Sequence, residues 1–271
     1  MTSFDLVVAT VGRADALDNL LGSLEGQTHR GYRVLVVDQN DDERVARVLA
    51  RHPSLRTERH RSAPGLSHAR NAALPHLRAE VAAFPDDDCT YPNGLLARVA
   101  ARLDAEPQLD GLTGRDDRGA WPDAPAVLTR TNLWNRAISF TIFLRRSIVT
   151  RVGAFDERLG LPESSGEEID YLIRAIDLGA RIEYDPALVV RHNAALRPLE
   201  ELGARDGRSI GYILRKHRYP PATVGGMLVR PLGGALVAAV HGDAARARFH
   251  ATTLRGRVSG YLASSSANSF S

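Results

Sequence analysis

Three consecutive aspartates, Asp86, Asp87 and Asp88, follow a short apolar run that ends at Phe84. Adjacent carboxylates repel one another, and burial beside a strand raises the free-energy cost of their charge. A hard divalent cation is the simplest remedy, because Mg²⁺ and Mn²⁺ are usually held by one or two carboxylates together with substrate phosphates. The alternative is a solvated turn in which Asp86 or Asp88 caps the helix from Asn93 onward.

Two further polar clusters also stand directly after apolar runs. Thr10 and Arg13 follow the first run, and Asp38 and Asp41 follow the second. In open α/β sheets, ligands bind at the carboxyl ends of the strands. We therefore expect the three polar clusters to converge on one crevice.

The elements that must position these residues alternate between two patterns. Short apolar runs predict strands, and apolar residues at helical spacing predict helices. The strands are expected at 4–10, 33–37 and 81–84, and the helices at 14–24, 43–50 and 66–77. This alternation predicts an α/β fold with a mixed, mainly parallel sheet that is covered by helices on both faces.

The second half of the chain is less regular. Residues 111–134 are rich in Gly, Pro, Asp and Arg, which predicts a long loop over the site, and Trp121 and Trp134 within it are suited to stack on a sugar or to pack in the core. The later elements are apolar segments at 137–144 and 148–152, a helix at 169–178, short strands at 181–184 and 188–190, and helices from His192 to about Tyr261.

From residues 4 to 193 the sequence resembles the family 2 glycosyltransferases of the GT-A type. The resemblance is carried by the order and spacing of VVATVGR, VLVVDQNDD, GLSHARNAAL, AFPDDDCTYPNGLL, VGAFDERL and SGEEIDYLIRAIDLG. It implies a Rossmann-like GT-A fold, a nucleoside diphosphate sugar donor, a divalent metal (Mn²⁺ or Mg²⁺) and a catalytic site that faces the cytosol.

The resemblance also implies nucleotide-binding residues. Asp38 resembles the aspartate that hydrogen-bonds the base, and a carboxylate suits a pyrimidine imide N–H. Thr10 and Arg13 lie in the loop that borders it, and Arg70 in the ARN motif resembles an arginine that contacts the base or the phosphates. The alternatives are a strand-end turn for Asp38 and an exposed helix position for Arg70.

Metal ligands follow from the same resemblance. Asp86 and Asp88 resemble the metal motif, with Asp88 the expected direct ligand, while Asp87 is placed to orient sugar or ribose hydroxyls. His192 in VVRHN resembles a histidine near the diphosphate or the metal, although lone histidines are often structural.

The catalytic base is where the sequence departs from its family. In the family, the catalytic base is usually the aspartate of a Glu-Asp pair. Here the pair is Glu167-Glu168, so Glu168 occupies the position of that aspartate. The extra methylene moves the carboxylate by about a bond length, and catalysis is sensitive to such shifts. Glu167 and Asp170 therefore stay open as alternative bases, and an acid that favours a helix N-terminus is the non-catalytic interpretation of all three.

These assignments predict a domain organisation. A catalytic domain is expected at 1–198, with a nucleotide-sugar-binding half at 1–110 and an acceptor and base half at 111–198. A helical C-terminal extension at 199–263 and a disordered tail at 264–271 complete the expected organisation.

Composition limits the class of protein and its location. The formal net charge of +3 gives little support for nucleic-acid binding, and we expect no nucleic-acid partner. Cys89 is the single cysteine, which excludes an intramolecular disulfide and a cysteine-based zinc site. With no secretory signal at the N-terminus, we expect a cytoplasmic protein.

The C-terminal extension contains an apolar stretch at 224–240 that Arg230 and Pro231 interrupt. This pattern predicts two buried helices that meet at Pro231 rather than a transmembrane helix. A basic run precedes the stretch, and such a combination can also dock on the anionic inner face of the cell membrane. Its residues are Arg205, Arg208, Arg215, Lys216, His217 and Arg218.

Together these features predict an inverting, metal-dependent hexosyltransferase, because one base and no evident nucleophile favour inversion. UDP-sugars are the expected donors and dTDP-sugars the alternative, and the acceptor is a hydroxyl of a glycan, glycolipid or natural product. The rival interpretations are a nucleotide-sugar-binding protein whose glutamate has disabled the base, and a nucleotidyltransferase. No Gly-rich phosphate loop follows the first strand, which disfavours the nucleotidyltransferase and also a dinucleotide-dependent oxidoreductase.

Overall fold

The structure is a computed structural model that describes residues 2–161, 164–193 and 199–263. The chain divides into two compact units, one made of Met1–Asp156 and Glu168–Ala194, the other of Glu157–Glu167 and Ala195–Ser271. The expected domain boundary at residue 198 and the expected tail at 264–271 lie outside the described residues.

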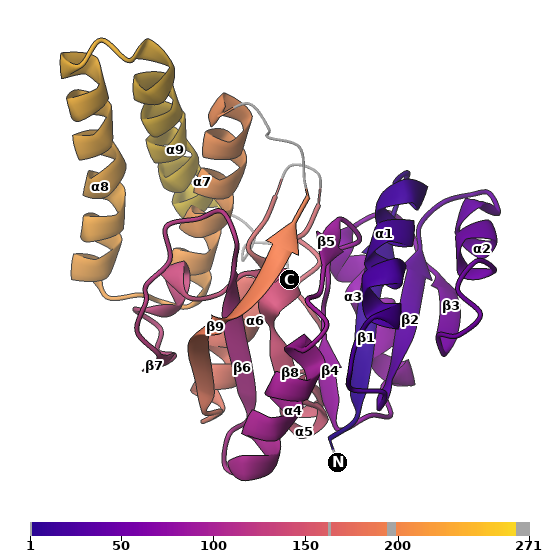
Figure 1. Cartoon of the computed structure of the whole chain (residues 1–271). Coiled ribbons are helices and arrows are strands. Elements are labelled where there is room, and N and C mark those ends of the chain that lie inside the picture. The colour runs from indigo at the N-terminus through magenta and orange to yellow at the C-terminus, as the bar shows by residue number, and fades with distance from the viewer. Residues whose placement is uncertain (1, 162–163, 194–198, 264–271) are drawn as a thin grey trace, which may run out of the picture. The chain divides into compact units, whose positions relative to one another are not determined.

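One mixed sheet forms the centre of the first unit (Figure 1). In the described part of the chain its order is β3-β2-β1-β4-β8-β6-β9-β5, and β7 pairs with β9. β1, β2, β3 and β4 pair in parallel, as do β6 and β9, whereas β8 is antiparallel to both of its neighbours. The strands are β1 Phe4–Thr10, β2 Tyr32–Asp38, β3 Thr57–Arg61, β4 Val81–Ala83, β5 Cys89–Thr90, β6 Gly111–Asp116, β7 Ala126–Val127, β8 Phe143–Arg145 and β9 Ile182–His192. The predicted mixed, mainly parallel α/β sheet is confirmed.

Helices cover both faces of this sheet. Alternate residues of β1, such as Leu6 and Val8, share one apolar cluster with residues of α1, α2 and α4. Val7 is buried outside that cluster, and α3 packs against β1 and β2. The helices are α1 Ala14–Glu25, α2 Arg44–Leu49, α3 Leu66–Ala73, α4 Leu95–Ala105, α5 Arg146–Val152 and α6 Glu167–Asp177, with 3-10 turns at Leu74–His76, Leu133–Asn135 and Ser139–Thr141.

The structure corrects the expected long loop at 111–134. Gly111–Asp116 is the strand β6, which lies inside the sheet between β8 and β9. Its glycines are required by close packing, because a Cβ on Gly114 would lie 2.1 Å from the carbonyl oxygen of Leu188. Glycines that favoured a loop in the sequence therefore allow two strands to approach each other, and the two short strands expected at 181–190 are the single strand β9.

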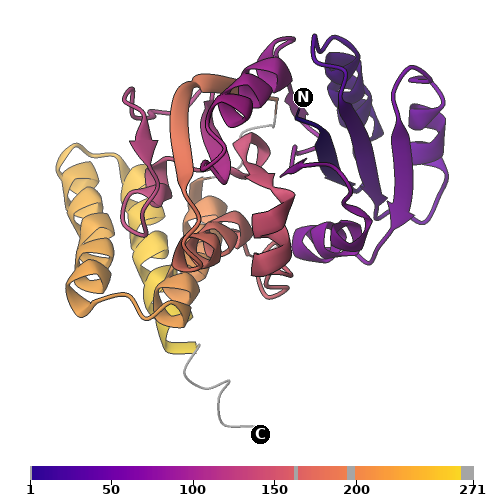
Figure 2. The same cartoon turned by 90° about the horizontal axis from the view of Figure 1, so that it is seen from below.

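Three helices make up the described part of the second unit beyond residue 198: α7 Leu199–Lys216, α8 Pro221–Val240 and α9 Ala244–Ala263. α9 packs along both α7 and α8 (Figures 1 and 2). α7 and α9 meet backbone to backbone, since a Cβ on Gly211 would lie 2.1 Å from the Arg257 carbonyl oxygen, and one on Gly260 would lie 2.0 Å from that of Arg208.

α8 contradicts the prediction of two buried helices that meet at Pro231. The helix runs without a break through Pro231, which is itself buried, and only 17% of its most apolar 18-residue window is buried. By length and composition alone α8 is able to cross a membrane. The apolar run is typical of a core segment, but few of its side chains are buried.

We expect Gly260→Ala to lower the free energy of unfolding by at least about 2 kcal/mol, because the added methyl would force α7 and α9 apart. The matched control is Gly226→Ala in α8, where a Cβ meets nothing within 4 Å. That change should be neutral or stabilising by up to about 1 kcal/mol. Denaturant unfolding followed by circular dichroism measures both, and equal stability of the two variants would refute the close packing.

Candidate functional site

Strand register brings the loops after β1 and β2 together. Thr10 of β1 lies opposite Asp38 of β2. Beyond the strands, the Gly12 amide donates a hydrogen bond to the Asn40 side-chain oxygen at 2.7 Å. Gly12 has φ of 70°, a conformation that suits glycine in such a turn. The first two polar clusters thus meet at one end of the sheet.

The acidic cluster is joined to the end of β9 by a short strand. β5 begins directly after Asp88 and pairs antiparallel with β9, so that Cys89 lies opposite His192. The Asn193 amide also donates to the Asp88 carbonyl oxygen at 2.8 Å. Residues that are about a hundred positions apart in the chain therefore share one site.

Asp86, Asp88 and His192 form a group that could hold a metal ion. Each offers one ligand atom, and the three atoms lie within 4.8 Å of one another. Carboxylate oxygens suit Mg²⁺ and Mn²⁺, and the imidazole nitrogen favours a transition metal. The donor set therefore fits Mn²⁺ somewhat better than Mg²⁺.

Arg13 provides positive charge to the same cluster. Its guanidinium contacts Asp88 Oδ2 at 2.5 Å and Asp87 Oδ1 at 3.0 Å. The Arg13 side chain is 50% exposed, whereas Asp87 is fully buried. Arg13, which we expected to border the nucleotide, thus contacts two of the three aspartates directly.

The three carboxylates have different electrostatic surroundings. Burial raises the pKa of Asp87 to about 6, although the charge of Arg13 opposes this shift. Burial also acts on Asp88, but the hydrogen bond from His192 and the charge of Arg13 outweigh it and lower the pKa of Asp88. The same hydrogen bond, at 3.1 Å, raises the pKa of His192. The ionised form of Asp88 is therefore well stabilised, whereas ionising the buried Asp87 costs free energy.

Asp86 is the more open member of the cluster, with a side chain that is 24% exposed. The Ser139 hydroxyl lies 3.3 Å from both of its oxygens, and Arg70 Nη2 lies 3.5 Å from Oδ1. Arg70 itself is 2% exposed, with its guanidinium 5.7 Å from the Phe84 ring and 5.4 Å from the Phe155 ring. Arg70 is not an exposed helix residue, and it acts on the site through Asp86.

Asp38 is fully buried, and its acceptor positions are filled. Oδ1 accepts from the Asn40 amide at 2.9 Å and from the Asn40 side chain at 2.7 Å. Oδ2 accepts from Arg59 Nε at 2.9 Å, and Arg59 Nη2 lies 2.6 Å away. Burial raises the pKa of Asp38, but these hydrogen bonds outweigh it and lower the pKa. A nucleotide base can therefore hydrogen-bond to Asp38 only if it displaces one of these partners.

The candidate bases lie at the start of α6. Glu168 is partly exposed, Glu167 is 4% exposed and Asp170 is fully buried. Asp170 Oδ2 accepts from Arg174 Nε at 3.0 Å, one helical turn away. Asp170 therefore stabilises the helix through Arg174, whereas Glu168 keeps access to solvent.

A loop after β6 lies beside His192. The Asp117 side chain accepts from the His192 amide at 3.4 Å, and Asp116 accepts from the Trp121 indole at 2.6 Å. Trp121 is partly exposed, and Asp116, which holds it, directly precedes the residue that contacts His192. The Trp134 indole donates instead to the Arg130 carbonyl oxygen at 3.1 Å.

Sequence reasoning missed Arg59, Asn40 and Ser139. Arg59 lies on β3, whose sequence TERHR contains no apolar residue and so carries no strand signal. Ser139 contacts Asp86, which is 53 positions away in the chain. Asn40 contacts Asp38 through the turn that follows β2. The sequence of β3 offers one usable sign, which is its run of charged residues next to a predicted sheet edge.

The mixed α/β sheet carries an acidic cluster at its strand ends, and the sequence comparison identifies the family. The model of the glycosyl transferase family 2 matches residues 5–159, and the chain belongs to this family. The predicted family is therefore confirmed.

Two mycobacterial proteins illustrate the relationship. The pre-mycofactocin glycosyltransferase of Mycobacterium tuberculosis is 28% identical over 214 residues, a match that covers 69% of this chain and 42% of that protein. An uncharacterized glycosyltransferase of the same organism is 29% identical over 164 residues, or 56% of this chain and 71% of that protein. The chain thus spans less than half the length of the first relative.

Solved structures share the fold. The mannosyltransferase PcManGT from Pyrobaculum calidifontis, in complex with GDP-Man and Mn²⁺, has a TM-score of 0.70 at 16% identity, over 96% of this chain and 87% of that chain. TarS residues 1–349 of S. aureus, in complex with UDP-GlcNAc, has a TM-score of 0.60 at 18% identity, over 96% and 92%. The fold is of the GT-A type, as predicted.

We expect Asp88→Asn and His192→Ala each to weaken Mn²⁺ binding at least about tenfold, because each removes one ligand from a set of three. Asp177→Asn is the matched control, since this carboxylate on α6 pairs with Arg130 and is 41% exposed. Isothermal titration calorimetry or electron paramagnetic resonance of Mn²⁺ provides the measurement. Equal Mn²⁺ affinities of Asp88→Asn and Asp177→Asn would show that this cluster does not hold the metal.

Proposed function

We propose that the chain is an inverting glycosyltransferase that moves a sugar from a nucleoside diphosphate sugar to an acceptor hydroxyl. The observation that carries the proposal is the acidic cluster, which adjoins Arg13 and His192 at the strand ends of a family 2 chain. UDP-sugars are the proposed donors, with dTDP-sugars as the alternative. The solved neighbours with GDP-Man and UDP-GlcNAc support a nucleotide-sugar donor in general terms.

Asp86, Asp88 and His192 would hold a divalent ion, Mn²⁺ or Mg²⁺. When bound, such an ion supplies positive charge that stabilises the departing diphosphate. Arg13 is half-exposed and contacts the same carboxylates, so it can turn to the donor phosphates once Asp88 is neutralised by other means. Asp87, buried beneath Arg13, would orient sugar or ribose hydroxyls.

Base recognition would involve Asp38 together with Arg59. The imide N–H of a pyrimidine would replace the Asn40 side-chain amide on Asp38 Oδ1, while Arg59 stays on Oδ2 and keeps the carboxylate ionised. Thr10, opposite Asp38 in the register, would border the same pocket. Arg70 would be a positioning residue for Asp86 rather than a phosphate ligand, because it is almost fully buried.

Glu168 is the proposed base. It is partly exposed at the start of α6, whereas Glu167 is buried and Asp170 is paired with Arg174. Its carboxylate would take the proton of the acceptor hydroxyl as the hydroxyl oxygen bonds to the anomeric carbon. The bond from that carbon to the diphosphate oxygen breaks on the opposite side, and its electron pair leaves with the diphosphate. One displacement inverts the configuration.

The acceptor would be a hydroxyl of a glycan, glycolipid or natural product. Trp121 supports a sugar acceptor, because it is partly exposed and is anchored by Asp116 beside the loop that contacts His192. The second candidate function is a nucleotide-sugar-binding protein without turnover. The observation that favours it is the glutamate at the position where the family usually has aspartate.

We expect Glu168→Gln to reduce turnover by roughly two to four orders of magnitude with little change in UDP affinity, because the amide cannot accept the proton. Glu167→Gln, its neighbour on the same turn, is the control and should keep near-wild-type turnover. UDP release from a panel of UDP-sugars with Mn²⁺ measures the rate, and calorimetry measures UDP binding.

Three other results would change the assignment. Loss of turnover in Glu167→Gln with an active Glu168→Gln would move the base by one residue. Loss of UDP binding in Glu168→Gln would mean that Glu168 holds the donor. Tight donor binding with no release of UDP by the wild-type chain would favour the binding protein over the transferase.

A further inference from the structure

α8 presents an apolar face that the described part of the second unit leaves uncovered. Its outward side chains include five large aliphatic residues that are 48–84% exposed: Val229, Leu232, Leu236, Val237 and Val240. Their spacing places them on one side of the helix, and the buried residues Val224, Pro231 and Ala238 lie on the other. Arg230 is the one charged residue within α8. A face of this kind is typical of a contact surface.

The sequence around this face is strongly basic. From Gly207 to Ala263 the chain has one carboxylate, Asp243. The same segment has nine cationic side chains: Arg208, Arg215, Lys216, Arg218, Arg230, Arg246, Arg248, Arg255 and Arg257. Seven of them are exposed, namely all except Lys216 and Arg257. The apolar face is therefore flanked in sequence by exposed positive charge on both sides.

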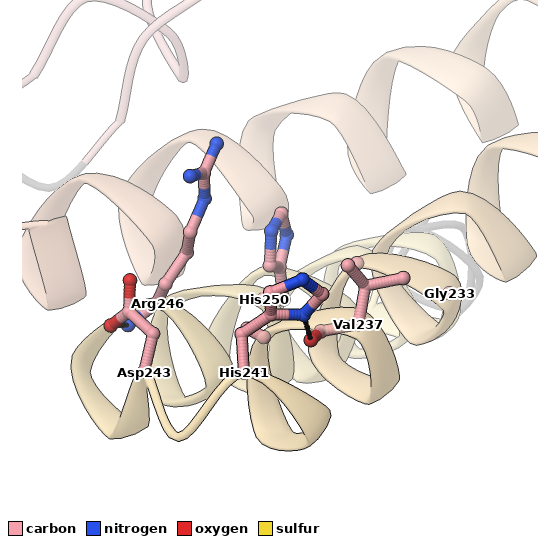
Figure 3. A pocket seen from close by; sticks show the side chains of 8 residues that line it. Gly233, Val237, His241, Asp243, Arg246 and His250 are labelled. Atoms are coloured by element: carbon pink, nitrogen blue, oxygen red, sulfur yellow. Dashed lines mark hydrogen bonds between the residues drawn. The ribbon is translucent and has the colours of Figure 1, made fainter.

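A hollow of about 440 Å³ opens at the C-terminal end of α8 (Figure 3). Val237 of the apolar face lines it, together with His241, Arg246 and His250. Arg246 and His250 can donate hydrogen bonds to an anion, whereas His241 Nδ1 already donates to the Val237 carbonyl oxygen at 2.9 Å. His250 packs over Gly234, where a Cβ would lie 2.6 Å from the ring. Asp243 also lines the hollow and accepts from the Arg246 amide at 2.9 Å.

We propose that this face docks on an anionic phospholipid bilayer, with α8 lying in the plane of the interface and a lipid phosphate at the hollow beside Arg246. Apolar side chains that enter the acyl boundary and cations that meet anionic headgroups are the two components of interfacial binding. The charge selects this occupant, because two copies of so basic a segment would repel each other.

The helix arrangement favours a surface position over a membrane span. α8 has the length and composition to cross a bilayer. However, α9 packs along α8 and carries Arg246, Arg248, Arg255 and Arg257, which would be costly inside the hydrocarbon core. A helix pair with one apolar outer face and a cationic partner is suited to lie on the surface. This docking proposal stands independently of the proposed glycosyl transfer.

The test is co-sedimentation of the full chain with vesicles of phosphatidylcholine alone or mixed with phosphatidylglycerol. Wild-type protein should bind the anionic vesicles and not the neutral ones, and added salt should weaken the binding. The double variant Leu232→Glu/Leu236→Glu should bind at least about tenfold more weakly. Arg246→Ala should lose about fivefold, the effect of one cation at such a surface.

Two variants separate docking from folding. Leu178→Glu is the matched control, an exposed leucine (41%) just after α6, and it should bind like the wild type. Val240→Glu changes the last residue of α8, which is 84% exposed, and it should weaken binding without disturbing helix packing. Circular dichroism confirms that each variant is folded.

Three results would overturn the proposal. The first is no sedimentation of wild-type protein with anionic vesicles at low salt. The second is equal binding of the wild type and Val240→Glu. The third is a wild-type dimer that Val240→Glu dissociates, with no vesicle binding, which would assign the face to a second copy of the chain.

Discussion

The site depends on the balance of charge around three adjacent aspartates. Arg13 reaches Asp87 and Asp88 from the loop after β1, and His192 reaches Asp88 from the end of β9. Both contacts require the sheet as it is built, because β1 leads into the first loop and the β5–β9 pairing fixes the second. Without the charge of Arg13, the buried carboxylate of Asp87 would be still more costly to keep ionised. The acidic cluster and the sheet around it therefore constrain each other.

A second charge pair organises the neighbouring pocket. Arg59 on the edge strand β3 holds Asp38 on β2, and Asn40 completes the acceptor positions of Asp38. The same asparagine also accepts a hydrogen bond from the Gly12 amide, in the loop that carries Arg13. The pocket expected for the base and the acidic cluster are thus linked through one loop, so a donor that displaces Asn40 would also affect Arg13.

The sequence predicted elements that have a strong apolar signal and a polar end. β1, β2 and β4 and the position of Asp86, Asp87 and Asp88 after β4 follow from such patterns. β3 has no apolar residue, and the glycines of β6 indicated a loop because their close contact with β9 is visible only in three dimensions. The convergence of Arg13 with Asp88 follows from their positions after strand ends, but the pair Arg59–Asp38 does not, since Arg59 lies on the strand that has no apolar signal. For α8, hydrophobicity indicated burial, because an apolar run alone does not distinguish a core helix from one with an exposed apolar face.

The most direct test of the account is a crystal structure of the chain with Mn²⁺ and UDP, with the metal located by its anomalous scattering. We expect one strong peak between Asp86, Asp88 and His192, with the Arg13 guanidinium moved from the aspartates to the diphosphate. A peak elsewhere, or a UDP complex in which Arg13 still bridges Asp87 and Asp88 without metal, would contradict it.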